Sequence, residues 1–112
     1  MATIQTRVSI WDTAGYEADR IVDDYIAEAY DQSFKQNLTV TGSTSTFEVE
    51  LGPISTVEFL YIATTQPITV YRNNSLESWN VGDVLLVIGC SITALHILAE
   101  NDCTITIYAA GT

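Results

Sequence analysis

Alternating apolar and polar residues run through the chain from residue 36 onward and predict a series of short strands. In "STFEVELG", Phe47, Val49 and Leu51 would face a core. Glu48 and Glu50 stand between them and would face solvent, as in a strand with one buried side. The segments "QNLTVTG", "STVEFLYIAT", "QPITVYRN", "SITALHILA" and "CTITIYAAG" have the same strand-like character. Breaks separate them about every 8 to 15 residues, which is typical of a β-sandwich or barrel.

The segment "DVLLVIG" departs from this alternation, because residues 84–88 are all apolar. Successive side chains of a strand point to opposite faces of its sheet, so both faces of this strand would be covered. We therefore expect a central strand, or one sandwiched between two layers.

The first third of the chain follows two other patterns. Residues 1–16 include the weak alternation "TIQTRVSIW", which predicts a strand or an extended arm. Within residues 17–35, apolar residues recur at three- and four-residue steps in "EADRIVDDYIAEAYDQSF", which predicts an amphipathic α-helix. Like-charged pairs four residues apart, such as Asp19 with Asp23, cost this helix about 0.2–0.5 kcal/mol each. The helix would therefore need a surface to pack on.

These patterns predict a mainly β protein with one domain over residues 1–112. An N-terminal arm or strand (1–16) and one N-terminal helix (17–35) would precede an antiparallel β-sandwich or jelly-roll-like fold (36–112). A chain of 112 residues that is 47% apolar can bury roughly two-thirds of its unfolded surface in one core. Its apolar runs are all shorter than the ~20 residues that a membrane-spanning helix requires, so we expect no membrane partner.

The net charge of the chain excludes some classes of binding partner. The chain has 14 acidic and 4 basic residues, for a net charge of −10, and half of the acids lie between Asp12 and Asp31. Such a surface repels phosphate backbones, so we expect no nucleic-acid partner. The acids fit a solubilising face better than a calcium site, because their spacing matches no calcium-binding loop. We expect no metal and no cofactor.

Residues that could support catalysis are scarce, so we expect no enzyme activity and no catalytic residue. His96 is the chain's one histidine, lies in an apolar segment and has no Cys or Ser at a motif spacing. Glu48 and Glu50 point to one side, as a glycosidase pair does, but outward carboxylates on a strand usually form a solvated face. Cys90 and Cys103 are too few for a disulfide scaffold; a bridge remains open, and free buried thiols are the expected state.

The stretch "IWDTAGYEADR" (10–20) resembles the switch segment of Rab- and Ras-like GTPases, which commonly reads WDTAGQE. That resemblance would give Asp12 the magnesium shell and Gly15 the γ-phosphate contact. A phosphate-binding loop and guanine recognition each require a lysine motif, and the chain's one lysine, Lys35, follows Phe34. Tyr16 also stands where that family has its water-positioning glutamine. We interpret the stretch as a coincidence.

Aromatic residues leave a binding role open. The chain has 11 of them, and Tyr61, Tyr71 and Trp79 are candidates for stacking against a sugar ring. Trp79 stands out because it lies in the polar segment "NNSLESWNVGD". The alternative is that Trp79 closes one end of the sandwich core.

The stretches "FLYIATTQPITVYRN" (59–73) and "VLLVIGCSITALHILAENDCTITIYAAGT" (84–112) resemble small β-rich proteins encoded among the virion genes of tailed bacteriophages. The resemblance covers about the last half of the chain and rests on strand alternation and turns. It implies a structural component of the particle and transfers no catalytic residue.

We therefore expect a non-enzymatic virion structural protein, most simply a capsid decoration (cement) protein that stabilises the head. It would work as a homo-oligomer, such as a trimer, bound to the major capsid protein or other virion proteins. A head–tail connector, a tail component or a carbohydrate- or receptor-binding module are the alternatives. The start "MATIQTRVSIWD" lacks signal-peptide features, so we expect synthesis in the host cytoplasm and a final location in the virion. The expected interface residues are the apolar residues of the arm, Ile4, Val8, Ile10 and Trp11.

Overall fold

The computed structural model describes residues 2–12, 19–73 and 78–112, and its secondary structure there consists of strands. In chain order these are β1 (Ala2–Asp12), β2 (Asp19–Tyr30), β3 (Gln32–Val40), β4 (Phe47–Val49), β5 (Val57–Thr64), β6 (Ile68–Arg72), β7 (Ser78–Val81), β8 (Val84–Ile92), β9 (Leu95–Leu98) and β10 (Cys103–Gly111). The expected mainly β class is confirmed.

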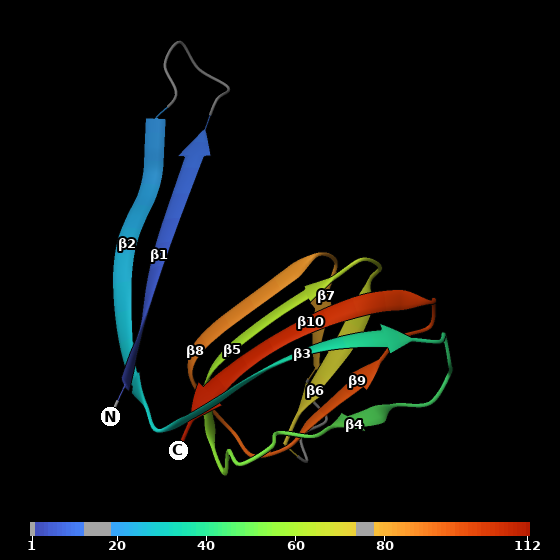
Figure 1. Cartoon of the computed structure of the whole chain (residues 1–112). Coiled ribbons are helices and arrows are strands. Elements are labelled where there is room, and N and C mark those ends of the chain that lie inside the picture. Colours follow the sequence, from blue (N-terminus) through green and yellow to red (C-terminus); the bar gives the residue numbers. More distant parts are fainter. Residues whose placement is uncertain (1, 13–18, 74–77) are drawn as a thin grey trace.

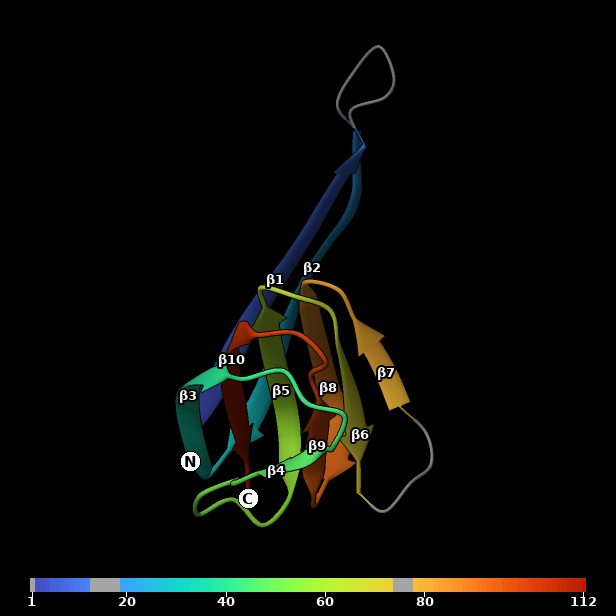
Figure 2. The ribbon, with the colours of Figure 1, turned by 90° about the vertical axis from the view of Figure 1, so that its right-hand side faces the viewer.

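Two four-stranded antiparallel sheets face each other and form a sandwich (Figures 1 and 2). The first sheet has the order β3-β10-β5-β8, and the second sheet has the order β4-β9-β6-β7. Along the chain, β3, β5, β8 and β10 fall in the first sheet, and the strands between them fall in the second. Eight antiparallel strands that cross between two sheets in this order form an arrangement of the jelly-roll type.

The core lies between the two sheets and follows from the alternation of side chains. Directly paired residues of neighbouring strands point to the same face of a sheet. Ile107 of β10 is paired with Ile62 of β5, and Val70 of β6 is paired with Ile97 of β9. All four side chains are fully buried. Their burial supplies the main stabilisation of the fold, about 25 cal/mol for each Å² of apolar surface removed from water.

The predicted helix over residues 17–35 is wrong in its described part. Residues Asp19–Tyr30 form β2, which pairs with β1 in an antiparallel hairpin from Ala2↔Tyr30 to Asp12↔Asp19. Apolar residues do recur here at three- and four-residue steps, as in an amphipathic helix. The like-charged pairs four residues apart weaken such a helix, and a helix of this length is marginal in water unless it packs on another element. In the hairpin, β1 supplies the backbone hydrogen-bond partners that the helix would have supplied internally.

Three further strands differ from expectation. The sandwich begins with β3 at Gln32, inside the segment expected to be helical, and β7 lies within the polar segment that contains Trp79, where no strand was expected. β8, expected to be central or sandwiched, is an edge strand of the first sheet. Its apolar residues on both sides therefore require another explanation.

The β1–β2 hairpin projects from the sandwich (Figure 1). Its foot is tied to the first sheet, where the amide of Asp31 donates to the carbonyl oxygen of Gly111 at 2.9 Å. Its far half extends beyond the sandwich, and the chain measures 47 × 37 × 25 Å. The radius of gyration is 15.6 Å, against about 13 Å for a compact chain of this length. The structure is thus a compact sandwich with an arm.

Candidate functional site

The first sheet has an outward side that differs from an ordinary solvated surface. Ile107 and Leu60 point into the core, so the residues that alternate with them point away from it. We call this side the outer face; it consists of Ser33, Lys35, Asn37, Thr39, Phe59, Tyr61, Ala63, Val84, Leu86, Ile88, Thr104, Thr106, Tyr108 and Ala110. None of these residues is Asp or Glu, in a protein of net charge −10. Glu58 stands at the margin of the face, at the register irregularity between Val57 and Phe59, where its carboxylate accepts a hydrogen bond from the Ser91 hydroxyl at 3.3 Å.

Four residues that are paired across the first sheet illustrate the composition of the outer face. The register places Lys35, Tyr108, Tyr61 and Leu86 side by side across β3, β10, β5 and β8. Leu86 is 37% exposed, and Val84 on the same edge strand is 57% exposed. The free side of an antiparallel sheet normally carries polar residues, so this apolar surface is of the kind that marks an interaction site.

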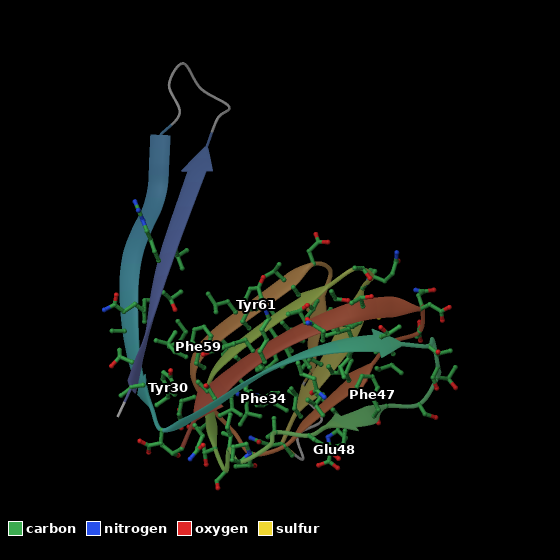
Figure 3. The ribbon with its side chains drawn as sticks, viewed as in Figure 1. Tyr30, Phe34, Phe47, Glu48, Phe59 and Tyr61 are labelled. Atoms are coloured by element: carbon green, nitrogen blue, oxygen red, sulfur yellow. The ribbon has the colours of Figure 1, made fainter. Side chains whose placement is uncertain are left out.

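Aromatic packing makes part of the outer face rigid. The rings of Phe59 and Tyr108 meet edge to face, with centroids 5.9 Å apart and planes at 81°. Figure 3 shows Phe59 and Tyr61 on the side of the sandwich toward the β1–β2 hairpin. Pairs with this geometry contribute about 0.5–1.5 kcal/mol beyond their buried area, so these side chains form a preformed surface.

A groove of about 710 Å³ lies between the outer face and the hairpin. Residues of β1 from Ile4 to Arg7 form one wall, and outer-face residues that include Lys35, Tyr61 and Tyr108 form the other. Two of the chain's four basic residues, Arg7 and Lys35, line this groove, and no acidic residue does among the side chains that the structure describes. The groove is therefore apolar with a positive fringe.

Four residues of the arm were predicted to form an interface, and two of their side chains are described. Ile4 and Val8 are half-buried on β1, and Ile4 lines the groove. The backbone of Ile10 and Trp11 belongs to β1, while their side chains lie outside the described residues. In β2, Ile26 is paired with Thr6 and is 36% exposed, so the hairpin also carries apolar surface.

The candidate stacking aromatics do not come together. Trp79 is paired with the fully buried Val70, and it packs against the core from inside the second sheet. Tyr71 is paired with Ser78 and lies on the opposite side of that sheet. Tyr61 belongs to the outer face of the first sheet. The centre of the polar segment before Trp79, residues 74–77, lies outside the described residues.

A second hollow, of about 380 Å³, lies along the edge of the second sheet. Its lining includes Pro67, Asn80 and Glu100, and it brings together no pair of titratable groups that could exchange a proton. Over the described part of the chain, no cluster of three or more His, Cys, Asp or Glu residues has the arrangement of a metal site. The same part of the chain contains no helix able to cross a membrane.

The GTPase-like stretch is only partly described. Asp12 ends β1 and is paired with Asp19 of β2. Gly15 and Tyr16 lie outside the described residues. The described residues of the motif thus belong to β1 and β2, the two strands of the hairpin.

Both cysteines are free thiols, Cys103 buried and Cys90 half-buried. The Cys90 thiol donates a hydrogen bond to the carbonyl oxygen of Val57, with Sγ and O 3.3 Å apart. Burial raises the pKa of the Cys90 thiol, and the nearby carboxylate of Glu58 raises it further. Cys90 is therefore held in its protonated, unreactive form.

This pKa shift predicts slow alkylation. At about pH 8.5, iodoacetamide should modify Cys90 in the folded protein at least about tenfold more slowly than in urea, as followed by mass spectrometry. Because the folded-state pKa is the higher one, the unfolded state loses its proton first, and this thiol makes stability fall as pH rises through the unfolded pKa. Equal rates in the folded and unfolded chain would contradict this assignment.

No protein-family model, curated protein or solved structure matches this chain. The class of the protein therefore follows from its own features, a two-sheet antiparallel sandwich with a projecting hairpin and an outer face that exposes Val84 and Leu86.

The outer face is the feature that the sequence alone did not locate. Its signal was present in "DVLLVIG", whose residues are apolar on both sides of the strand. That pattern predicted cover on both sides, and the structure provides cover on one side only, through the core beneath Leu85. Val84 and Leu86 on the other side remain exposed.

Proposed function

We propose that this chain is a non-enzymatic structural protein of a bacteriophage particle, and within that class a capsid decoration protein that works as a homo-oligomer. The observation that carries the proposal is the outer face, a sheet surface on a strongly acidic chain that exposes the apolar residues Val84 and Leu86 and itself holds no carboxylate. Such a surface fits burial against another protein, and the projecting hairpin supplies a second contact element. The likeness of residues 59–112 to phage virion proteins points to the particle as the place of assembly.

The fold agrees with this proposal by analogy. Jelly rolls recur in viral capsid proteins, although the same architecture also serves lectins and enzymes. A decoration protein acts passively: it buries surface on the capsid and on its own copies, and the gain opposes the loss of freedom on association. The apolar outer face and the hairpin are surfaces of the kind that this role requires.

Quantitative mass spectrometry of purified particles tests the proposal. Particles isolated by density-gradient centrifugation from the phage-producing culture should contain this chain in a fixed ratio to the major capsid subunit. A copy number matching a single ring would instead assign the chain to the connector or the tail. Particles that lack the chain would overturn the virion role.

A further inference from the structure

The outer face and the β1–β2 hairpin have complementary properties. We propose that the outer face is the docking site for the β1–β2 hairpin of a second copy of this chain, in a reciprocal exchange of arms. This inference concerns the partner of one surface and does not rest on the virion role. Three observations carry it: the charges of the two elements, their areas, and the exposed position of the hairpin.

Charge is the first observation. The chain segment from Asp12 to Asp31, which contains β2, holds seven of the chain's fourteen acidic residues, opposed within that segment by Arg20. The outer face holds no acid and one base, Lys35, whose side chain is exposed. The residues of the face itself present Lys35 and no carboxylate to an acidic ribbon, whereas the rest of the acidic chain repels it.

Area is the second observation. Four strands about 4.8 Å apart, each about 20 Å long, give the outer face a total area of roughly 400 Å². Phe59 and Ala110 within it are already buried in the single chain, so the area open to a partner is smaller. A stable interface buries about 800 Å² on each partner. The face alone therefore supplies less than half of the required area. If each copy buries both its face and its hairpin, the hairpin provides the remainder.

The position of the hairpin is the third observation. A two-stranded hairpin is marginally stable in water without a surface to pack on. The far half of this hairpin extends beyond its own sandwich, and Ile26 on β2 is 36% exposed. Docking on a second copy would cover Ile26 together with Val84 and Leu86, the three large apolar residues that the described chain leaves most exposed.

A carboxylate introduced into the outer face tests whether this face is the interface. Native mass spectrometry of the full chain over a hundredfold concentration range should show a closed oligomer that persists on dilution. Leu86→Glu places an unpaired carboxylate in the proposed interface and should raise the dissociation constant at least about tenfold. Asn80→Glu, at an exposed position of the second sheet, is the matched control and should leave assembly unchanged. A monomeric wild type, or an unaffected Leu86→Glu variant, would overturn the proposal.

The identity of the occupant is tested by exchanging charges. Lys35→Glu and the double variant Asp23→Lys/Asp24→Lys should each weaken self-assembly, the first on the face and the second on the hairpin. Mixed at equal concentration, they should form mixed oligomers, because each acidic hairpin then finds Lys35 and each basic hairpin finds Glu at position 35. Failure of the mixture to assemble, with both variants folded by circular dichroism, would show that the hairpin is not the occupant.

Discussion

Gly111→Ala should lower the free energy of unfolding by about 3 kcal/mol or more, the largest single-methyl effect expected in this chain. A Cβ at this position would overlap the carbonyl oxygen of Thr56 and lie 3.0 Å from the Cα of Val57. Both are backbone atoms of the neighbouring segment of the same chain, at the start of β5, so the clash cannot be relieved by a side-chain rotation. The carbonyl oxygen of Gly111 also accepts the hydrogen bond from Asp31, so displacement would disturb the foot of the hairpin.

Urea denaturation followed by circular dichroism would measure this loss. Gly82→Ala is the matched control, because a Cβ there meets no atom within 4 Å. Its effect should stay within about 0.5 kcal/mol. A loss under about 1 kcal/mol for Gly111→Ala would show that β10 and β5 can separate at this point at little cost.

Trp79→Ala should lower the free energy of unfolding by about 2–4 kcal/mol. The indole packs against the buried core from β7, and the guanidinium carbon of Arg72 lies 5.3 Å from the centroid of its ring. The substitution removes both contacts and leaves a cavity at the edge of the second sheet. A full loss of about 5 kcal/mol is not expected, because Trp79 is half-buried.

Tyr71→Ala provides the comparison on the opposite side of the same sheet. Tyr71 is also half-buried, but it points away from the core, and its removal should cost less than about 1 kcal/mol. If both substitutions cost equally little, Trp79 would lie outside the core, and a ligand-binding role for it would regain support. Unfolding should be followed by far-ultraviolet circular dichroism, because the one tryptophan that the variant retains, Trp11, belongs to the hairpin and not to the sandwich.

The strands of the sandwich were predictable where one side of the strand is buried and the other side is exposed to solvent. "STFEVELG" shows this, since Val49 is buried while Glu48 and Glu50 are exposed. β7 was missed because it is short and because Ser78 and Asn80 are its polar residues, a composition that also suits a loop. β2 was misassigned because its apolar residues fall at helical spacing, and the pairing with β1 that decides its structure is a tertiary property.

The candidate site was less predictable than the fold. The arm was recognised through Ile4 and Val8, since its weak alternation was visible in the sequence. The outer face was not, because it assembles residues from four strands that are distant in the chain, such as Lys35 and Leu86. Periodicity assigns residues to the two sides of one strand, but the order of strands in the sheet decides which sides form a common surface.

The acidic residues of the hairpin also oppose one kind of unproductive self-association, the stacking of hairpins from different copies. Two hairpins that meet side by side bring their acidic residues together, so ribbon-to-ribbon stacking, the first step toward an open fibre, is opposed by repulsion. This protection depends on ionic strength, because charges separated by more than about 10 Å are screened at 0.1 M salt. Concentrated salt would therefore leave the apolar contacts intact while removing the repulsion that discriminates between ordered and disordered association.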